Sequence, residues 1–168
     1  MNMLPSVPAA VGRGQQRQWG GPVGTVVDMA LSSPERQEFL AQPHIGALAV
    51  TAGPDRAPLT VPIWYQYAPG GELWVLTGPK SRKFALIEQA GRFSLMAETL
   101  EPSVRYVTVE GPVTRVVPMT DELHLEMVTR YLAPEKVDAY LAKSAAFGPQ
   151  VAIYMRPEHW LSADLGAL

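Results

Sequence analysis

Short runs of apolar and β-branched residues, separated by Gly and Pro turn signals, fill most of the chain after residue 45. Runs of this length and composition are typical of β-strands. Pro62 lies inside one run and removes a ladder donor, which indicates an edge, a bulge or a strand that faces a ligand. Gly111-Pro112 marks a bend or bulge in the longest run. Six strands are predicted, over residues 46–52, 59–67, 72–78, 92–98, 104–117 and 151–164.

A longer period, with apolar residues three or four positions apart, predicts helices between these strands. Ser33 can cap the first helix, with Pro34 at the first helical position, where the missing N–H is not needed. This helix is expected to end near Pro43. Apolar residues at 84, 86, 87 and 90 predict a second, short helix that Gly91 ends. A third opens at Thr120 and is broken by Pro134, and a fourth runs on to about Ala146. Helices set apart from sequential strands predict an α+β fold, built on an antiparallel sheet or a small barrel.

Composition adds predictions about domains and compartment. A chain of 168 residues, 47% hydrophobic and 18% charged, is long enough for one domain with a substantial core. Residues 1–24 are rich in Pro and Gly and are expected to be a flexible leader, with residues 25–168 as the single domain. The sequence has no cysteine, which fits the cytoplasm, and no apolar run reaches the roughly 18 residues of a membrane span. We therefore expect a cytoplasmic protein without a membrane partner.

Common catalytic and binding motifs are missing from the sequence. The net charge of −2 argues against nucleic acid as a partner, because phosphate contacts need many Lys and Arg residues. His44, His124 and His159 lack metal-ligand spacing, so no metal site is expected. The sequence has no GxSxG nucleophile elbow, no GxGxxG fingerprint and no Walker A loop. Serine-hydrolase, Rossmann and P-loop chemistry are therefore not supported.

One cluster of charge differs from this background. Lys80, Ser81, Arg82 and Lys83, which we call the basic corner, follow a predicted strand and open a predicted helix. Backbone N–H groups and the helix dipole favour an anion at such a point. Arginine adds a planar fork for phosphate oxygens, lysine adds a point charge, and the serine hydroxyl can donate once more. From composition alone, a solvated helix start is the commoner explanation of such a cluster.

The order of residues around the basic corner resembles a known family. In the flavin split-barrel family, which contains pyridoxamine 5′-phosphate oxidase and its deazaflavin-dependent relatives, a T-x-x-x-S-R-K-x-x-x-I-x-x-x-x-R-x-S pattern carries the phosphate site. The resemblance extends over about residues 33 to 165. The pattern is present here as Thr77, Ser81, Arg82, Lys83, Ile87, Arg92 and Ser94.

This resemblance implies a six-stranded split β-barrel that forms a homodimer, with two cofactor sites at the interface. Strand 59–67 would run along the cofactor ring, and the basic corner would hold the cofactor phosphate. Tyr106 and Trp160 would close the site across subunits. The backbone groups implied at the ring are those of Val61, Pro62, Ile63 and Trp64, and the residues implied at the phosphate are Thr77, Lys80, Ser81, Arg82 and Lys83.

Three departures separate the chain from the pyridoxamine-phosphate oxidases of this family. Val61 stands where those enzymes have an arginine, and Tyr106 stands where they have a glutamine. The chain ends in WLSADLGAL, without the arginine–histidine motif that binds substrate phosphate. The resemblance thus points to the branch that uses coenzyme F420, a deazaflavin, with FMN as the alternative cofactor. Lys80, with Arg56, could begin the longer cationic groove that the polyglutamate tail of F420 favours.

The implied function is an F420-dependent oxidoreductase that transfers a hydride from the reduced deazaflavin to an electron-poor double bond or a quinone-like small molecule. The alternatives are an FMN-binding oxidoreductase of the same superfamily and a non-catalytic carrier of a flavin or deazaflavin. No catalytic residue is assigned, because the cofactor carries the chemistry. Tyr65, Tyr67 and Tyr106 are candidates for proton donation or stacking, although packed strand aromatics are the commoner case.

Overall fold

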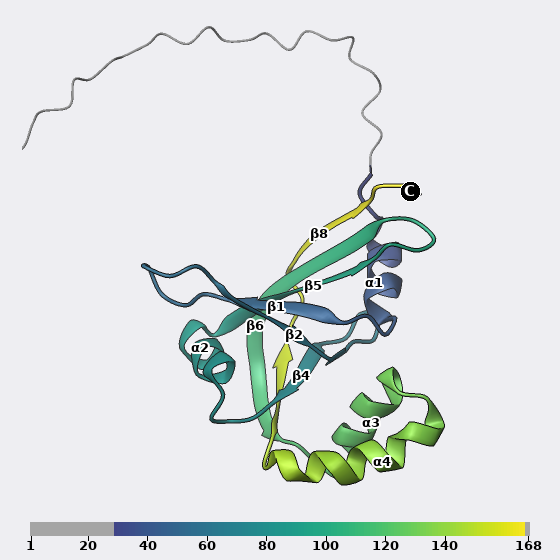
Figure 1. Ribbon diagram of the computed structural model, residues 1–168. Helices are drawn as coiled ribbons and strands as arrows, with labels where there is room; N and C mark the ends of the chain where they lie inside the picture. Colours follow the sequence, from purple (N-terminus) through teal and green to yellow (C-terminus); the bar gives the residue numbers. More distant parts are fainter. Residues whose placement is uncertain (1–28, 167–168) are drawn as a thin grey trace, which may run out of the picture.

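The computed structural model describes residues 29–166, so the predicted leader lies outside the described residues (Figure 1). No helix in this part of the chain combines the length and the apolar character needed to cross a membrane. The helices are α1 (Ser33–Ala41), α2 (Arg82–Ala90), α3 (Asp121–Tyr131), α4 (Pro134–Ser144) and the short 3-10 helix η1 (Ala145–Phe147). The strands are β1 (Gly46–Val50), β2 (Leu59–Ile63), β3 (Tyr65–Gln66), β4 (Leu73–Thr77), β5 (Arg92–Thr99), β6 (Arg105–Pro118), β7 (Val151–Met155) and β8 (His159–Asp164).

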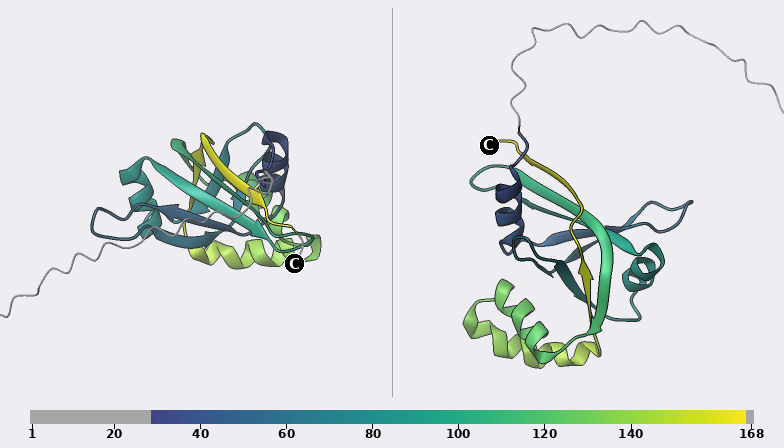
Figure 2. Two further views of the ribbon diagram at one scale, coloured as in Figure 1. Left: turned by 90° about the horizontal axis from the view of Figure 1, so that it is seen from above. Right: turned by 180° about the vertical axis from the view of Figure 1, so that it is seen from behind.

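The strands form one antiparallel sheet that curls round on itself. Their order is β2-β1-β5-β6-β7-β4-β3, and β8 pairs with β6 beside this path. The curl makes an open half-barrel (Figures 1 and 2). The two ends of the order, β2 and β3, do not pair with each other and are separated along the chain by Trp64 alone, so the barrel is split at this residue. The predicted α+β split barrel is confirmed, with its helices at the periphery.

The strand count differs from the six predicted, because two of the predicted strands are each divided. The strand expected over 59–67 breaks at Trp64; its first part pairs with β1 and its second part with β4. The strand expected over 151–164 breaks at residues 156–158, giving β7 and β8. The described part of the chain therefore has eight strands. Each break marks the point where a strand changes its neighbour.

Strand β6 is long enough to serve both halves of the barrel. Residues up to Pro112 pair with β5 and β8, and the residues beyond pair with β7. The register shifts between Val113 and Arg115, so the irregularity predicted at Gly111-Pro112 lies slightly further along the chain. Gly111 instead allows the backbone of β6 to pass close to that of Arg156, because a Cβ on Gly111 would lie 1.8 Å from the carbonyl oxygen of Arg156.

Helix α1 begins with a capping box. The Ser32 hydroxyl accepts a hydrogen bond from the Glu35 N–H, and the Glu35 carboxylate accepts one from the Ser32 N–H at 2.8 Å. The expected cap at Ser33 is therefore wrong by one residue, and Ser33 is the first helical residue. The three-residue spacing from serine to glutamate decides between the two adjacent serines.

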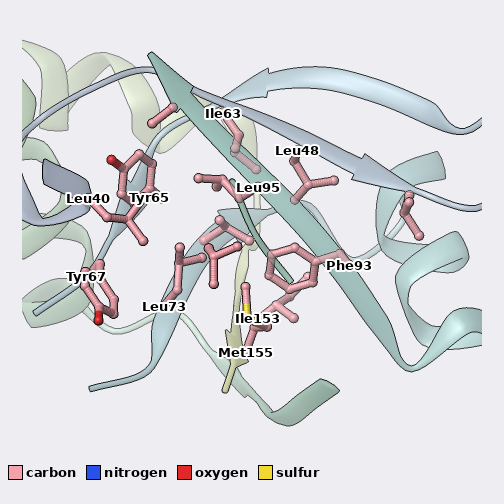
Figure 3. Packing of buried hydrophobic residues seen from close by; sticks show 14 of the residues in the cluster. Leu40, Leu48, Ile63, Tyr65, Tyr67, Leu73, Phe93, Leu95, Ile153 and Met155 are labelled. Carbon is pink, nitrogen blue, oxygen red and sulfur yellow. The ribbon is translucent and has the colours of Figure 1, made fainter. Parts of the chain in front are cut away.

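Two clusters of buried side chains hold the barrel and its helices together. The larger fills the barrel interior, where Leu48, Tyr65, Leu73, Leu95 and Ile153 are fully buried (Figure 3). Each such aliphatic side chain contributes roughly 1.5–3 kcal/mol through burial. The smaller cluster lies on the outer face of β4 and β7, beneath α3, and consists of Trp74, Met127, Ala152 and Tyr154. Helices α3 and α4 are thus fixed to one side of the barrel.

Candidate cofactor site

The basic corner is a tight, hydrogen-bonded connection between β4 and α2. Ser81 is the N-cap of α2, and its hydroxyl accepts from the Phe84 N–H at 3.2 Å. The same hydroxyl lies 3.0 Å from the hydroxyl of Thr77, the buried last residue of β4. Helix α2 ends at Gly91, whose φ of +65° lies in the left-handed region. The strand end and the helix start are therefore held together by side chains of the family pattern.

The basic corner carries three cations at the start of α2. Among residues 29–166, none forms an ion pair with Lys80, Arg82 or Lys83. The first turns of α1, α3 and α4 each contain an acidic residue, whereas the first turn of α2 contains none. The positive end of the α2 dipole is thus reinforced by three cations, an arrangement that an anion would stabilise.

The predicted ring-binding segment lies between two hollows. The larger, about 530 Å³, is lined by Ile45, Gly46, Ala47, Thr60, Val61, Pro62, Met96 and Glu98. The smaller, about 220 Å³, is lined by Pro62, Ile63, Trp64, Leu76, His124, Met127, Val128, Tyr140 and Gln150. Pro62 belongs to both. Leu76, which lines the smaller hollow, directly precedes Thr77, so this hollow and the basic corner are linked through β4.

Strand β2 is an edge strand, one of the possibilities that Pro62 indicates in the sequence. It pairs with β1 along one side and has no strand partner in the described sheet along the other. The free edge offers backbone donors and acceptors beside both hollows, as the strand expected along a cofactor ring would do. Val61 and Pro62 line the larger hollow, and Pro62, Ile63 and Trp64 line the smaller one, so their place along a cofactor ring stays a prediction.

The Trp64 side chain is enclosed by the outer helices. Its ring stacks on that of Tyr131 at 4.8 Å with an interplanar angle of 9°, and the Tyr140 ring lies 5.3 Å away on a tilt. The Tyr131 hydroxyl accepts from the Tyr65 N–H at 2.9 Å and lies 3.0 Å from the His44 carbonyl oxygen. These contacts fix α3 at the split of the barrel, where the two hollows adjoin.

Two of the tyrosines considered as proton donors are core residues. The Tyr65 hydroxyl donates to the Gln42 carbonyl oxygen at 3.3 Å, and the Tyr67 hydroxyl donates to the Gln37 side-chain oxygen at 3.0 Å. Burial raises the pKa of both hydroxyls above the usual range for tyrosine. Neither side chain lines either hollow. Tyr65 and Tyr67 are thus packed strand aromatics.

The structure does not bring Tyr106 and Trp160 to the basic corner within one chain. Tyr106 is half-buried on β6, opposite Glu98 of β5 and Ala163 of β8. The Trp160 ring packs against Tyr67 at 6.0 Å and lies beneath the Arg36 guanidinium at 5.0 Å. The role of these two residues across a subunit interface stays a prediction.

Three polar residues of the smaller hollow were not assigned to the site from the sequence. His124, Tyr140 and Gln150 line it, and His124 is bonded to Ser144. From the sequence, His124 was considered only as a metal ligand. Within the described residues, no three His, Asp or Glu side chains gather as a metal site would require. A signal was present, because His124 is a polar residue adjoining the apolar stripe of its helix.

A split barrel with a basic corner beside its split defines the flavin-binding, pyridoxamine-phosphate-oxidase-like class of proteins. Residues 32–163 match the model of the family described as pyridoxamine 5′-phosphate oxidase, and the chain belongs to that family. Members of the superfamily are typically oxidoreductases. A search of curated proteins found no match to this chain.

Solved structures share the fold at low sequence identity. A conserved hypothetical protein of Mycobacterium tuberculosis is 25% identical, with a TM-score of 0.61, over 82% of this chain and 88% of that protein. A protein named F420 reductase is 24% identical, with a TM-score of 0.58, over 74% of this chain and 94% of its own. A FAD-binding protein of Mesorhizobium loti is 20% identical, with a TM-score of 0.51, over 79% and 93% of the two chains.

Proposed function

We propose that this protein is an F420-dependent oxidoreductase, which transfers a hydride from reduced deazaflavin to an electron-poor double bond or a quinone-like small molecule. The observation that carries the proposal is the basic corner, whose three cations lack acidic partners among the described residues at the positive end of α2. The corner adjoins the strand end that borders the smaller hollow. A phosphate in the corner would therefore leave an attached ring within reach of β2.

The residues present fit such a cofactor. Arg82, Lys83 and the N–H groups at the start of α2 would hold the phosphate, with Ser81 kept in place by Thr77. The free edge of β2 would offer hydrogen bonds to the polar edge of the ring. When bound, the reduced deazaflavin supplies the hydride, while the protein orients the ring and excludes water.

Two observations favour F420 over FMN. Lys80 is exposed just before the phosphate-binding residues, and it would extend the cationic surface toward the anionic tail that FMN lacks. The protein named F420 reductase has the same fold over nearly its whole length. The FMN alternative is supported by the compactness of the basic corner and by the FAD-binding protein among the structural neighbours. A flavin or deazaflavin carrier without turnover is the third possibility.

We further propose that the protein is a homodimer with the cofactor sites at its interface. The paired registers place Pro62, Ala47, Met96, Thr108 and Leu161 opposite one another across five strands. Directly opposite residues share one face of a sheet. These five side chains are exposed or half-buried and largely apolar, and Pro62, Ala47 and Met96 also line the larger hollow. A second copy on this face would cover it and close the hollow.

Replacement of Arg82 and Lys83 together by Ala tests the phosphate assignment. We expect the affinity for F420 to fall by roughly tenfold or more, since two charge-assisted contacts would be lost. Fluorescence titration of the purified protein measures this affinity. The matched control replaces Lys136 and Lys143 of α4 with Ala, which removes the same charge elsewhere. Equal affinity in the two double variants would remove the basic corner from the site.

Measurement of turnover distinguishes an enzyme from a carrier. Reduced F420 bound to the protein should be oxidised faster when a quinone is added than it is with quinone alone in buffer. A cofactor that binds but whose oxidation the protein does not accelerate would favour the carrier.

A further inference from the structure

The smaller hollow has the shape and chemistry of a pocket for a small uncharged molecule. Its volume of about 220 Å³ is below the roughly 300–1,000 Å³ of drug-sized ligand sites, which indicates a ligand of one or two rings. Of the described residues, none of those that line it is Asp, Glu, Lys or Arg. Trp64 and Tyr140 provide aromatic surface, and Leu76, Met127 and Val128 provide aliphatic surface.

His124 brings a titratable group to this apolar pocket. The Ser144 hydroxyl donates to the Leu141 carbonyl oxygen at 3.0 Å, and it lies 3.3 Å from His124 Nε2. When the Ser144 hydroxyl donates to Leu141 it accepts from the ring, and neutral His124 then carries its proton on Nε2. Among residues 29–166, none forms a hydrogen bond with Nδ1 of His124.

The contact between His124 and Ser144 also joins α3 to α4. If His124 were purely structural, this contact would be its whole role. Two features go beyond that role. The imidazole lines the hollow, although an apolar residue would complete the wall equally well. The pair also engages Nε2, which leaves Nδ1 as the ring nitrogen that can exchange a proton with a ligand.

We propose that this hollow receives the oxidised substrate, a small uncharged quinone, and that His124 donates the proton for its reduction. This inference rests on the proposed function. A quinone that takes up one hydride and one proton becomes a hydroquinone. The electron pair and the first hydrogen come from the reduced cofactor, and the second hydrogen comes from Nδ1–H of the imidazolium. Loss of that proton leaves the Nε2–H tautomer that Ser144 stabilises, and water then restores the imidazolium.

Binding of a probe quinone tests the pocket without any cofactor. We would titrate the protein with 2-methyl-1,4-naphthoquinone and follow tryptophan fluorescence, because Trp64 lines the hollow. Quenching should occur in the wild type and be largely lost in Trp64→Phe. His124→Gln should weaken quinone affinity by about fivefold or more, since a hydrogen bond to the carbonyl is changed. His159→Gln, an exposed histidine on β8, is the matched control and should leave the affinity unchanged.

Turnover tests the proton. His124→Gln should lower kcat for quinone reduction by roughly tenfold or more, as loss of a general acid does, while it binds F420 as tightly as the wild type. If His124→Gln does not fold, Leu76→Phe provides a second test, because its ring would fill the hollow and should abolish quinone binding. Wild-type quinone affinity in both variants, or an unchanged kcat in His124→Gln, would overturn the inference. Failure of the proposed function would differ, since F420 and FMN would then not bind while quinone quenching remained.

Discussion

At the scale of single residues, Gly111 lies where any side chain would push two backbone segments apart. The backbone of β6 passes close to that of Arg156, and a Cβ on Gly111 would overlap the Arg156 carbonyl oxygen. Two backbone hydrogen bonds flank the contact, from the Arg156 N–H to Pro112 and from the Glu158 N–H to Glu110. Neither backbone can withdraw without the loss of these bonds.

Gly111→Ala should therefore destabilise the protein by about 3 kcal/mol or more, as overpacking against rigid backbone does. Urea denaturation followed by circular dichroism measures the free energy of unfolding. Gly78→Ala is the control, because a Cβ on Gly78 meets no atom within 4 Å, and its effect should stay below about 0.5 kcal/mol. Similar stability of the two variants would contradict the close approach of β6 to Arg156.

His44 gives the stability a pH dependence. Burial lowers the pKa of His44, and the neighbouring Arg130 lowers it further. Its Nε2 is buried without a hydrogen-bond partner among the described residues, and its ring stacks on Phe39 at 4.2 Å. The folded state thus holds His44 neutral at a pH where the unfolded chain already binds a proton. The free energy of unfolding should fall as pH drops below the ordinary histidine pKa of about 6.5.

The measurement is urea denaturation at several pH values between about 7 and 5. His44→Phe keeps a ring against Phe39 but cannot titrate, so its stability should change less over this range. A wild type and variant with parallel pH profiles would exclude His44 as the cause.

Part of the site could be predicted at the residue scale. The end of α2 at Gly91 was predicted and is present, because it is a local feature set by neighbours within a few positions. His124 could not be placed in a pocket from sequence. Its contact with Ser144 spans 20 residues and depends on how α3 and α4 pack.

At the scale of elements, the side chain of Arg130 on α3 contacts the end of α1. The Arg130 guanidinium donates to the carbonyl oxygens of Leu40, Ala41 and Gln42, at 3.0, 2.7 and 2.6 Å. These carbonyls lie at the C-terminal end of α1, where intrahelical partners run out and a cation is favoured. Arg130 therefore caps the C-terminal end of α1 and positions α3, whose Tyr131 stacks on Trp64.

Arg130→Ala should lower the free energy of unfolding by roughly 3 kcal/mol, because it leaves several carbonyls without their charged donor. Arg156→Ala, which removes an exposed arginine paired with Glu158, should cost less than about 1 kcal/mol. Denaturation of both variants under identical conditions makes the comparison. Equal losses would show that the contacts of Arg130 with α1 contribute little.

The elements themselves were largely predictable, but the strand breaks were not. Periodicity and turn residues locate each apolar run, because these are properties of a few adjacent positions. The breaks at Trp64 and at residues 156–158 occur where a strand exchanges one partner for another. That exchange depends on the closure of the barrel, which no local pattern encodes.

At the scale of the whole molecule, the proposed dimer predicts the effect of a charge on the exposed sheet face. Leu161 is 62% exposed in the single chain and lies at the end of the row that begins at Pro62. Leu161→Arg should shift the protein from dimer to monomer, since an unpaired cation would be buried at the interface. Leu125→Arg, at an exposed leucine on α3, should leave the dimer intact. Sedimentation velocity distinguishes the species, and a wild-type monomer would contradict the proposal.

The cofactor assignment is tested by a fluorescence titration of the cofactor-free protein with F420 and, separately, with FMN. We expect micromolar binding of F420 and weaker binding of FMN, because the cationic surface around Lys80 would continue beyond the phosphate. Tighter binding of FMN would keep the phosphate seat but contradict the deazaflavin assignment. Binding of neither would leave the basic corner a solvated helix start and contradict the proposed function itself.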